Sequence, residues 1–258
     1  MMLAGKTALL TGASSGINLA IARRLGELGA RLAVLSRTPE KIEAAAAGLR
    51  DQGIDAMALA GDVRDPQLMA ALAAQAANRL GPLDILVSGA AGNFFAPATA
   101  MSANAFKTIV DIDLIGTFNV IKAAFPHLRQ PGASVVSISA PQGQRAMRNQ
   151  AHACAAKAGI DMLTRCLALE WGEFGIRVNA VSPGPIAGTE GLARMAADDA
   201  LTDAIVEDLP MHRLGLGQEI GDAVAFLCSD AAAFVTGTIL DCDGGMRLGN
   251  FHVAESSR

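Results

Sequence analysis

The sequence predicts a single α/β domain, a doubly wound Rossmann fold whose central parallel sheet is covered by helices on both faces. Short apolar runs alternate with longer segments of helical period, and the runs are apolar at every position instead of at every second one. Strands of that kind need cover on both faces, and repeated strand–helix units imply right-handed crossovers. No linker or composition shift divides the 258 residues, so the whole chain, 1–258, is expected to form one domain.

The expected elements follow from these patterns in chain order. The apolar runs expected as strands are 7–10, 32–35, 56–60, 84–87, 134–138, 177–181 and 238–240. The helical segments after the first six are 16–29, 39–52, 66–80, a long stretch from 102, 150–173 and 218–228. Residues 189–209 interrupt this rhythm with a charged helical insertion, a position that suits a lid over the carboxyl ends of the strands. A surface helix without a role is the alternative.

Composition and charge argue against several functional classes. The formal net charge is −4, so no broad basic face indicates binding to nucleic acid or to an anionic membrane. The longest uncharged stretch, 85–106, is broken by Gly, Asn and Pro, whereas a membrane helix needs about 20 mostly apolar residues. The four cysteines show no metal spacing, and the first strand begins too early to leave room for a signal peptide. We therefore expect buried, reduced thiols, no metal and a cytoplasmic location.

A glycine-rich turn follows the first strand and opens the first helix. In Thr11-Gly12-Ala13-Ser14-Ser15-Gly16-Ile17-Asn18, the glycines allow backbone N–H groups to approach a pyrophosphate at the helix N-terminus. The turn alone is weak evidence, and a plain tight turn is the alternative reading. Its place directly after the first strand of a βα series makes the dinucleotide interpretation much stronger.

This turn resembles that of the short-chain dehydrogenase/reductase family, with Asn18 in place of the last glycine, a change expected to strain the turn slightly. The resemblance spans nearly the whole chain. It implies further cofactor contacts at Asp62 and Val63 near the adenine, at Ala90 and Ala91, and at Pro183, Gly184, Ile186 and Thr189 on the nicotinamide side.

The end of the second strand predicts which cofactor is used. An acid there would accept hydrogen bonds from the 2′-hydroxyl of NAD and repel a 2′-phosphate. This chain has Ser36 and Arg37 instead, and no acid before Glu40. Ser36 can donate a hydrogen bond and Arg37 can bind a phosphate, so the sequence favours NADPH.

The family's usual catalytic residues are largely missing. Most members use a Tyr as proton donor, a Ser that positions the carbonyl oxygen, a Lys that holds the nicotinamide ribose, and an Asn on the central helix. Here Lys157 is kept, Ala153 and Ala140 occupy the Tyr and Ser positions, and Asp113 replaces the Asn. The chain contains no tyrosine. Either it is a cofactor-binding relic without chemistry, or its site has been rebuilt for another reaction.

A narrower resemblance favours a rebuilt site. The runs 90–94, 104–108, 111–113, 116–120 and 183–192, together with the His-Ala-x-x-Ala-Lys pattern at 152–157, resemble 2,4-dienoyl-CoA reductases of the peroxisomal type. That group also lacks the usual Tyr, and family likeness implies a tetramer. The chain ends Glu-Ser-Ser-Arg without a peroxisomal tripeptide, which is expected of a cytoplasmic relative.

The narrower resemblance implies roles for individual residues. Reducing a dienoyl thioester needs hydride at the far end of the diene, donors facing the developing enolate, and a proton for carbon. Lys157 would hold the ribose, and Asp113 would orient a water or donate a proton itself. Asp243 is implied as a second acid, although a structural turn residue is nearly as good an interpretation. For His152 a structural role is favoured over an acid.

The substrate-side positions matched by the same resemblance are Arg64, Phe94, Ser102, Asn104 and Arg194. Each by itself is more often an ordinary surface or packing residue, and Arg194 on the expected lid is the strongest choice. The main expectation is therefore an NADPH-dependent reductase of 2,4-dienoyl-CoA or a similar unsaturated acyl thioester. One rival is reduction of another activated alkene or carbonyl with atypical proton delivery. The other is a non-catalytic NADP-binding protein.

Overall fold

A computed structural model describes residues 1–196 and 198–249. Its sheet has seven parallel strands in the order β3-β2-β1-β4-β5-β6-β7. The strands are β1 (Thr7–Thr11), β2 (Arg31–Ser36), β3 (Ala56–Ala60), β4 (Ile85–Ser88), β5 (Ser134–Ile138), β6 (Arg177–Pro183) and β7 (Ile239–Cys242). Each expected strand is therefore present, with ends shifted by two residues at most.

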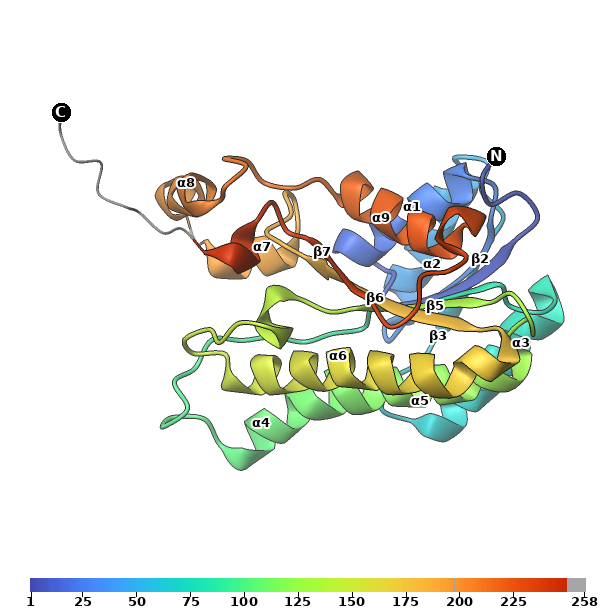
Figure 1. The fold of residues 1–258 in the computed structure, drawn as a ribbon, viewed down its shortest axis with the longest axis horizontal. Coiled ribbons are helices and arrows are strands. Elements are labelled where there is room, and N and C mark those ends of the chain that lie inside the picture. The colour runs from blue at the N-terminus through green and yellow to red at the C-terminus, as the bar shows by residue number, and fades with distance from the viewer. Residues whose placement is uncertain (197, 250–258) are drawn as a thin grey trace.

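Two helix layers enclose the sheet (Figure 1). One layer contains α1 (Gly16–Glu27), α2 (Pro39–Arg50) and α9 (Gly217–Cys228). The other contains α3 (Pro66–Leu80), α4 (Ala103–Val110), α5 (Gly116–Ala124) and α6 (Ala151–Trp171). Two hydrophobic cores lie between the sheet and these layers, which explains why β1, β4 and β5 are buried at every residue. The doubly wound fold predicted from the apolar runs is confirmed.

The long helical stretch expected from residue 102 is not one regular α-helix. A π-helical turn, Asp111–Ile115, separates α4 from α5. Such turns insert one extra residue per turn and occur frequently at functional sites. Here the turn carries Asp113, whose side chain is buried, whereas Asp111 faces Lys107 one turn earlier and forms an ion pair with it.

The expected lid region lies beyond the carboxyl end of β6. It forms two short helices, α7 (Glu190–Met195) and α8 (Asp199–Asp208), which Figure 1 shows beside the end of the sheet that α4 also reaches. Thr189 and Asp198 accept hydrogen bonds from the first-turn amides of these helices.

Two global expectations can be compared with the described residues. No helix among them combines the length and apolar character that crossing a membrane requires. All four cysteines are free, but only Cys228 is buried, Cys154 and Cys242 are half-buried, and Cys166 is exposed. The expectation of buried thiols is therefore correct for one cysteine of four.

Candidate functional site

The order of the strands reverses between β1 and β4, and the loops that follow these two strands meet there. Ligands of doubly wound sheets bind in the crevice at such a point. Thr11 accepts hydrogen bonds through Oγ1 from the amides of Gly89 and Ala90, at 3.1 and 3.4 Å. A Cβ on Gly12 would stand 2.9 Å from the Ala90 backbone, and its φ is +71°. Only glycine fits this close approach, as the dinucleotide interpretation of the turn requires.

The start of α1 offers backbone donors to a phosphate. Ser15 is the N-cap residue, yet its side chain makes no capping hydrogen bond, and Gly16 has a φ of +58°. The first amides of the helix, which include those of Gly16 and Ile17, have no partner within the helix. Ser14 and Ser15 are partly to fully exposed beside them. These residues fit a pyrophosphate at the helix N-terminus.

Asn18, in place of the family's last glycine, makes a hydrogen bond that the sequence analysis did not anticipate. It lies within α1 and donates a hydrogen bond through Nδ2 to the Gly89 carbonyl at 2.7 Å. A Cβ on Gly89 would come within 2.1 Å of the Asn18 side chain, so the glycine provides the room. The substitution thus connects α1 to the β4 loop, and the expectation that Asn18 strains the turn slightly stays a prediction.

Arg37 after β2 and Arg64 after β3 both lie near Asp62. Ser36 Oγ is buried and has no hydrogen-bond partner, while Arg37 is exposed. The side chain of Arg64 donates to both oxygens of Asp62 and, with Arg37 contributing less, lowers the pKa of that carboxyl. Burial opposes this shift. An unpartnered hydroxyl next to an exposed guanidinium fits a 2′-phosphate.

The remaining expected cofactor residues lie along the same edge of the sheet. Val63 is buried and contacts Gly116, and Ala91 is exposed in the loop after β4. Beyond β6, Thr189 Oγ1 donates to the Ile186 carbonyl at 2.8 Å. Gly184 and Ile186 line a cavity of about 340 Å³ together with Asp243, and Pro183 ends the strand directly before them.

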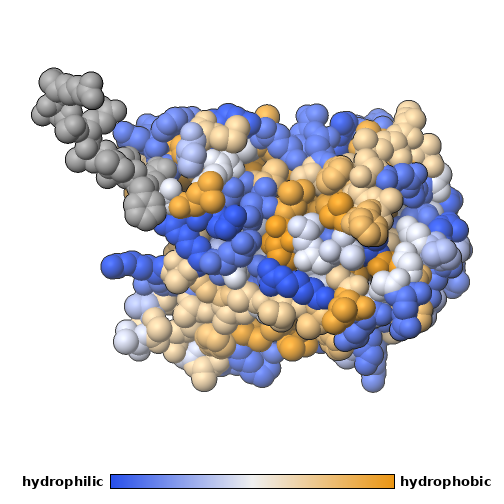
Figure 2. Space-filling view, viewed as in Figure 1, coloured by the Kyte–Doolittle hydropathy of each residue, from blue (hydrophilic) through white to orange (hydrophobic). Residues whose placement is uncertain are grey.

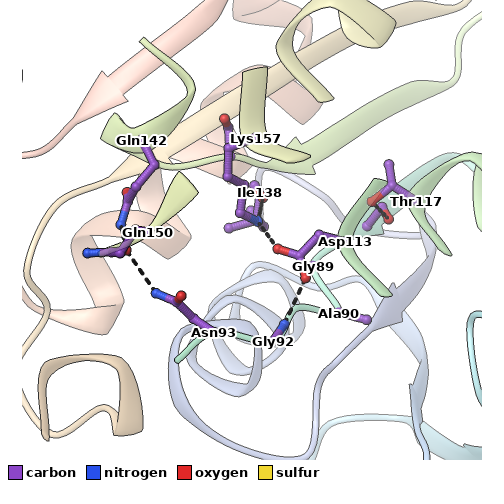
Figure 3. Close-up of polar contacts among 12 residues, drawn as sticks. Gly89, Ala90, Gly92, Asn93, Asp113, Thr117, Ile138, Gln142, Gln150 and Lys157 are labelled. Atoms are coloured by element: carbon purple, nitrogen blue, oxygen red, sulfur yellow. Dashed lines mark hydrogen bonds and ion pairs between the residues drawn. The ribbon is translucent and has the colours of Figure 1, made fainter. Parts of the chain in front are cut away.

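Asp113 and Lys157 form a buried ion pair (Figure 3). Asp113 is 1% exposed and Lys157 8%. Asp113 Oδ1 accepts from the Gly92 amide at 2.8 Å, and Oδ2 lies 3.3 Å from Lys157 Nζ without the alignment of a hydrogen bond. Lys157 Nζ donates to the Ile138 carbonyl at 3.0 Å. Asp113 is therefore placed to accept hydrogen bonds, and Oδ2 can still accept one from a water or a ligand.

An amide network that the sequence analysis missed stands beside this pair. Gln150 Oε1 accepts from Asn93 Nδ2 at 3.0 Å and from Gln142 Nε2 at 2.9 Å (Figure 3). Arg194 donates to the Asn93 carbonyl at 3.0 Å. The network joins the loops after β4 and β5 to the start of α6 and to α7. Amides in two separate loops, after β4 and after β5, give no local pattern that would have revealed it.

The sequence analysis also missed a buried carboxyl on α6, the second one of this site after Asp113. Asp161 lies one turn after Lys157, is 2% exposed, and accepts a hydrogen bond from Ser139. Burial raises the pKa of Asp161, and the hydroxyl of Ser139 opposes the shift. Its i, i+4 spacing from Lys157 was the available signal.

The other expected site residues have mixed surroundings. Both oxygens of Asp243 accept backbone amides of its own turn, from Gly245 at 2.9 Å and Arg247 at 2.7 Å. Ser102 caps α4, and the Asn104 carbonyl accepts from Thr108. Phe94 stacks on His152 with ring centroids 4.1 Å apart. Of the substrate-side residues, Phe94 and Arg194 contact the loop segment next to Gly92, the residue that binds Asp113. Arg64 instead contacts Asp62.

Comparison with known proteins places this arrangement in a family. A family model described as enoyl-(acyl carrier protein) reductase matches residues 12–247. The peroxisomal 2,4-dienoyl-CoA reductase of Danio rerio is 43% identical, with a match that covers 96% of this chain and 83% of the fish protein. The corresponding protein of Arabidopsis thaliana is 38% identical over 95% of this chain and 85% of its own length.

Solved structures agree with the sequence matches. A short chain dehydrogenase from Bacillus anthracis superposes with a TM-score of 0.86 at 32% identity, covering 96% of this chain and 98% of that one. A variant of actinorhodin polyketide ketoreductase, solved with NADPH, gives 0.88 at 31% identity over 94% and 97% of the two chains. The chain is thus an oxidoreductase of the short-chain dehydrogenase/reductase family.

Proposed function

We propose that this protein uses NADPH to reduce 2,4-dienoyl-CoA or a closely similar unsaturated acyl thioester. The observation that carries the proposal is the buried Asp113–Lys157 ion pair. It lies in a site that lacks the family's usual Ser and Tyr hydroxyls, because Ala140 and Ala153 stand at those positions. A carbonyl reductase needs those hydroxyls to hydrogen-bond to the carbonyl oxygen of its substrate and to protonate it. Reduction of a conjugated thioester instead needs a proton on carbon, which a carboxylate with an oriented water can provide.

The residues around the crevice support NADPH as the cofactor. Gly12, Ser14, Ser15, Gly16 and Ile17 would hold the pyrophosphate, and Ser36 with Arg37 would hold the 2′-phosphate. Asp62, Val63, Ala90 and Ala91 would flank the adenine and its ribose, and Pro183, Gly184, Ile186 and Thr189 the nicotinamide side. Bound there, the cofactor supplies the hydride.

Lys157 and Asp113 would have different roles in the reaction. Lys157 would hold the nicotinamide ribose and place positive charge near the electrons that move toward the thioester oxygen. Asp113 Oδ2 would accept a hydrogen bond from a water and orient its other proton toward the substrate carbon. Asp243 is a second candidate for proton delivery, but its oxygens would first have to leave the amides of its own turn.

Recognition of the CoA thioester would involve residues at the rim. Phe94 would flank the acyl chain. Arg194, which lies on the expected lid and donates to the Asn93 carbonyl, would bind an anionic group of the CoA. Arg64, Ser102 and Asn104 complete the proposed set, with Arg64 close to the 2′-phosphate position as well.

Steady-state oxidation of NADPH tests this function directly. The purified protein is offered matched panels of 2,4-dienoyl-CoA, 2-enoyl-CoA and ketone substrates, with NADH in parallel. We expect turnover of the dienoyl thioesters, with NADPH preferred. Turnover of ketones alone would replace the proposed reaction by carbonyl reduction, and NADPH binding without any turnover would identify a non-catalytic NADP-binding protein.

We further propose a homotetramer located in the cytoplasm. Apolar side chains remain exposed on the outer helix layer, among them Ile115, Phe118, Met162 and Leu169, and Figure 2 shows a largely apolar surface over this layer. Exposed apolar surface of this kind is typical of a subunit interface. Sedimentation equilibrium measures the mass of the assembly, which should be that of four chains. Fractionation of the cells should place the protein in the cytoplasmic fraction.

A further inference from the structure

His152 is buried in a way that the fold alone does not explain. Its side chain is fully buried, and neither ring nitrogen has a hydrogen-bond partner of acceptable geometry. Burial lowers the pKa of His152, and the Phe94 backbone and the charge of Asp113 oppose this shift only in part. A buried imidazole without partners is costly, and the natural explanation is a partner that arrives with water or ligand.

Three side chains of this region have buried polar atoms without a hydrogen-bond partner in the described part of the chain. These atoms are the two nitrogens of His152 on the first turn of α6, Oδ2 of Asp113 on the π-helical turn, and Oδ1 of Asn93 on the β4 loop. The contacts connect them: Phe94 stacks on His152, Asn93 precedes Phe94, and Gly92 donates to Asp113. The charge of Asp113 opposes the lowering of the His152 pKa.

Buried polar groups of this number are sufficient to hold one water, which needs two to four polar partners. A neutral imidazole has one donor and one acceptor, so it can hold a water in either tautomer. Lys157 adds a cation beside Asp113. The missing hydroxyls at positions 140 and 153 leave the site in need of a proton donor that is not a tyrosine or a serine.

We propose that His152 is a positioning residue which, with Asp113, holds the water that protonates the substrate carbon. The inference rests on the proposed reduction of a dienoyl thioester. Hydride adds at the far end of the diene, the electron pair moves toward the thioester, and one O–H bond of the water breaks as a C–H bond forms. The hydroxide left behind recovers a proton from bulk water, and His152 remains neutral over the cycle.

Replacement of His152 by Phe separates this role from a structural one. Phe keeps a ring to stack on Phe94 and removes the two unpartnered nitrogens, so the folded protein should be as stable as the wild type or more so. NADPH affinity should change by about twofold at most. Turnover of dienoyl-CoA should fall roughly a hundredfold, in kcat rather than KM, and the solvent deuterium isotope effect on kcat should rise.

Two further variants make the experiment conclusive. His152→Asn restores one donor and one acceptor, and we expect it to regain about tenfold over His152→Phe in kcat, which also covers the case in which Phe does not fit. Cys154→Ala changes the same helical turn and should leave kcat, the isotope effect and the melting temperature unchanged.

Distinct results overturn the two proposals. A His152→Phe protein with wild-type kcat and isotope effect would overturn the water-positioning role alone. Parallel losses of melting temperature, NADPH affinity and turnover in both His152 variants would show a structural histidine. A wild type that reduces no dienoyl-CoA would overturn the proposed function and this role with it.

Discussion

The cofactor side and the proton-delivery side of the crevice are built from different parts of the chain. On the cofactor side, the decisive features are backbone features: the positive φ and close approach at Gly12, and the free first turn of α1. On the proton-delivery side, the decisive features are side chains from separate elements, with Asp113 from the π-helical turn and Lys157 from α6. A reaction can therefore be changed by side-chain replacement while cofactor binding stays intact.

The two sides also differ in what they leave unpartnered. On the cofactor side, the buried Ser36 Oγ has no hydrogen-bond partner among the described residues. On the other side, Asp113 Oδ2 and both nitrogens of His152 have no hydrogen-bond partner among the described residues, and we propose that they hold a water. Variants on the first side should change affinity for the cofactor, and variants on the second should change turnover. The following four predictions test that division, in order of decreasing effect.

Lys157→Ala should have the largest effect, because in the proposed site Lys157 serves both cofactor binding and proton delivery. The variant leaves Asp113 as a buried carboxylate without its cation, a loss that typically costs about 3–5 kcal/mol of stability. We expect turnover to fall by more than about a hundredfold and NADPH to bind more weakly. Chemical denaturation, NADPH fluorescence titration and steady-state kinetics measure the three effects.

Lys157→Met is the matched control, since it keeps the aliphatic stem and removes only the charge. A double variant with Asp113→Asn should recover part of the lost stability, because the unpaired charge is then gone. Full activity in Lys157→Ala would refute the assignment of this residue to the site.

Asp113→Asn should lose turnover selectively. The amide oxygen can still accept from Gly92, but the group facing Lys157 no longer carries a negative charge or accepts from a water. General acid–base assistance typically contributes about 10²–10⁴-fold, so we expect roughly a hundredfold lower kcat with dienoyl-CoA. NADPH affinity should be retained, since Gly12, Gly16 and Arg37 are unchanged. Equal kcat for variant and wild type would move proton delivery to another group, with Asp243 next to test.

Arg37→Ala should have a smaller effect, confined to one cofactor. A charge-assisted hydrogen bond contributes about 1.5–3 kcal/mol, so NADPH should bind about tenfold or more weakly while NADH is nearly unaffected. Titration of both cofactors by fluorescence measures the difference. Lys41→Ala removes the same charge from nearby α2 and serves as control. Equal weakening of NADPH and NADH by Arg37→Ala would contradict the 2′-phosphate contact.

Asn18→Gly should have the smallest effect on activity. It restores the family's usual residue but removes the hydrogen bond to the Gly89 carbonyl and adds a glycine within α1. Together these changes should destabilise the fold by about 1–2 kcal/mol, with kcat and cofactor affinity close to the wild type. Thermal unfolding measures the shift. A stabilised Asn18→Gly protein would show that Asn18 strains the turn after all.

Much of this molecule was predictable from local sequence patterns. The apolar runs predict every strand, because a strand buried on both faces leaves a continuous apolar signature. The assignment of both Lys157 and Asp113 to the site needed the family resemblance, and the structure brings the two within 3.3 Å of each other, a pairing that the sequence analysis did not predict. The split of the helix after residue 102 was missed, because the extra residue of a π-helical turn hardly disturbs a helical pattern.

The sequence by itself determined the fold, the glycine turn and the absence of the usual tyrosine and serine, since each is a property of consecutive residues or of single positions. Only the tertiary structure decided which polar atoms have partners. In the folded protein, both oxygens of Asp243 bind amides of its own turn, Asn93 in the loop after β4 joins Gln142 and Gln150 in the loop after β5, and neither nitrogen of His152 has a hydrogen-bond partner within the part of the chain that the structure describes. The physical reason is that hydrogen bonds between distant segments depend on distance and direction in space, which sequence spacing does not encode.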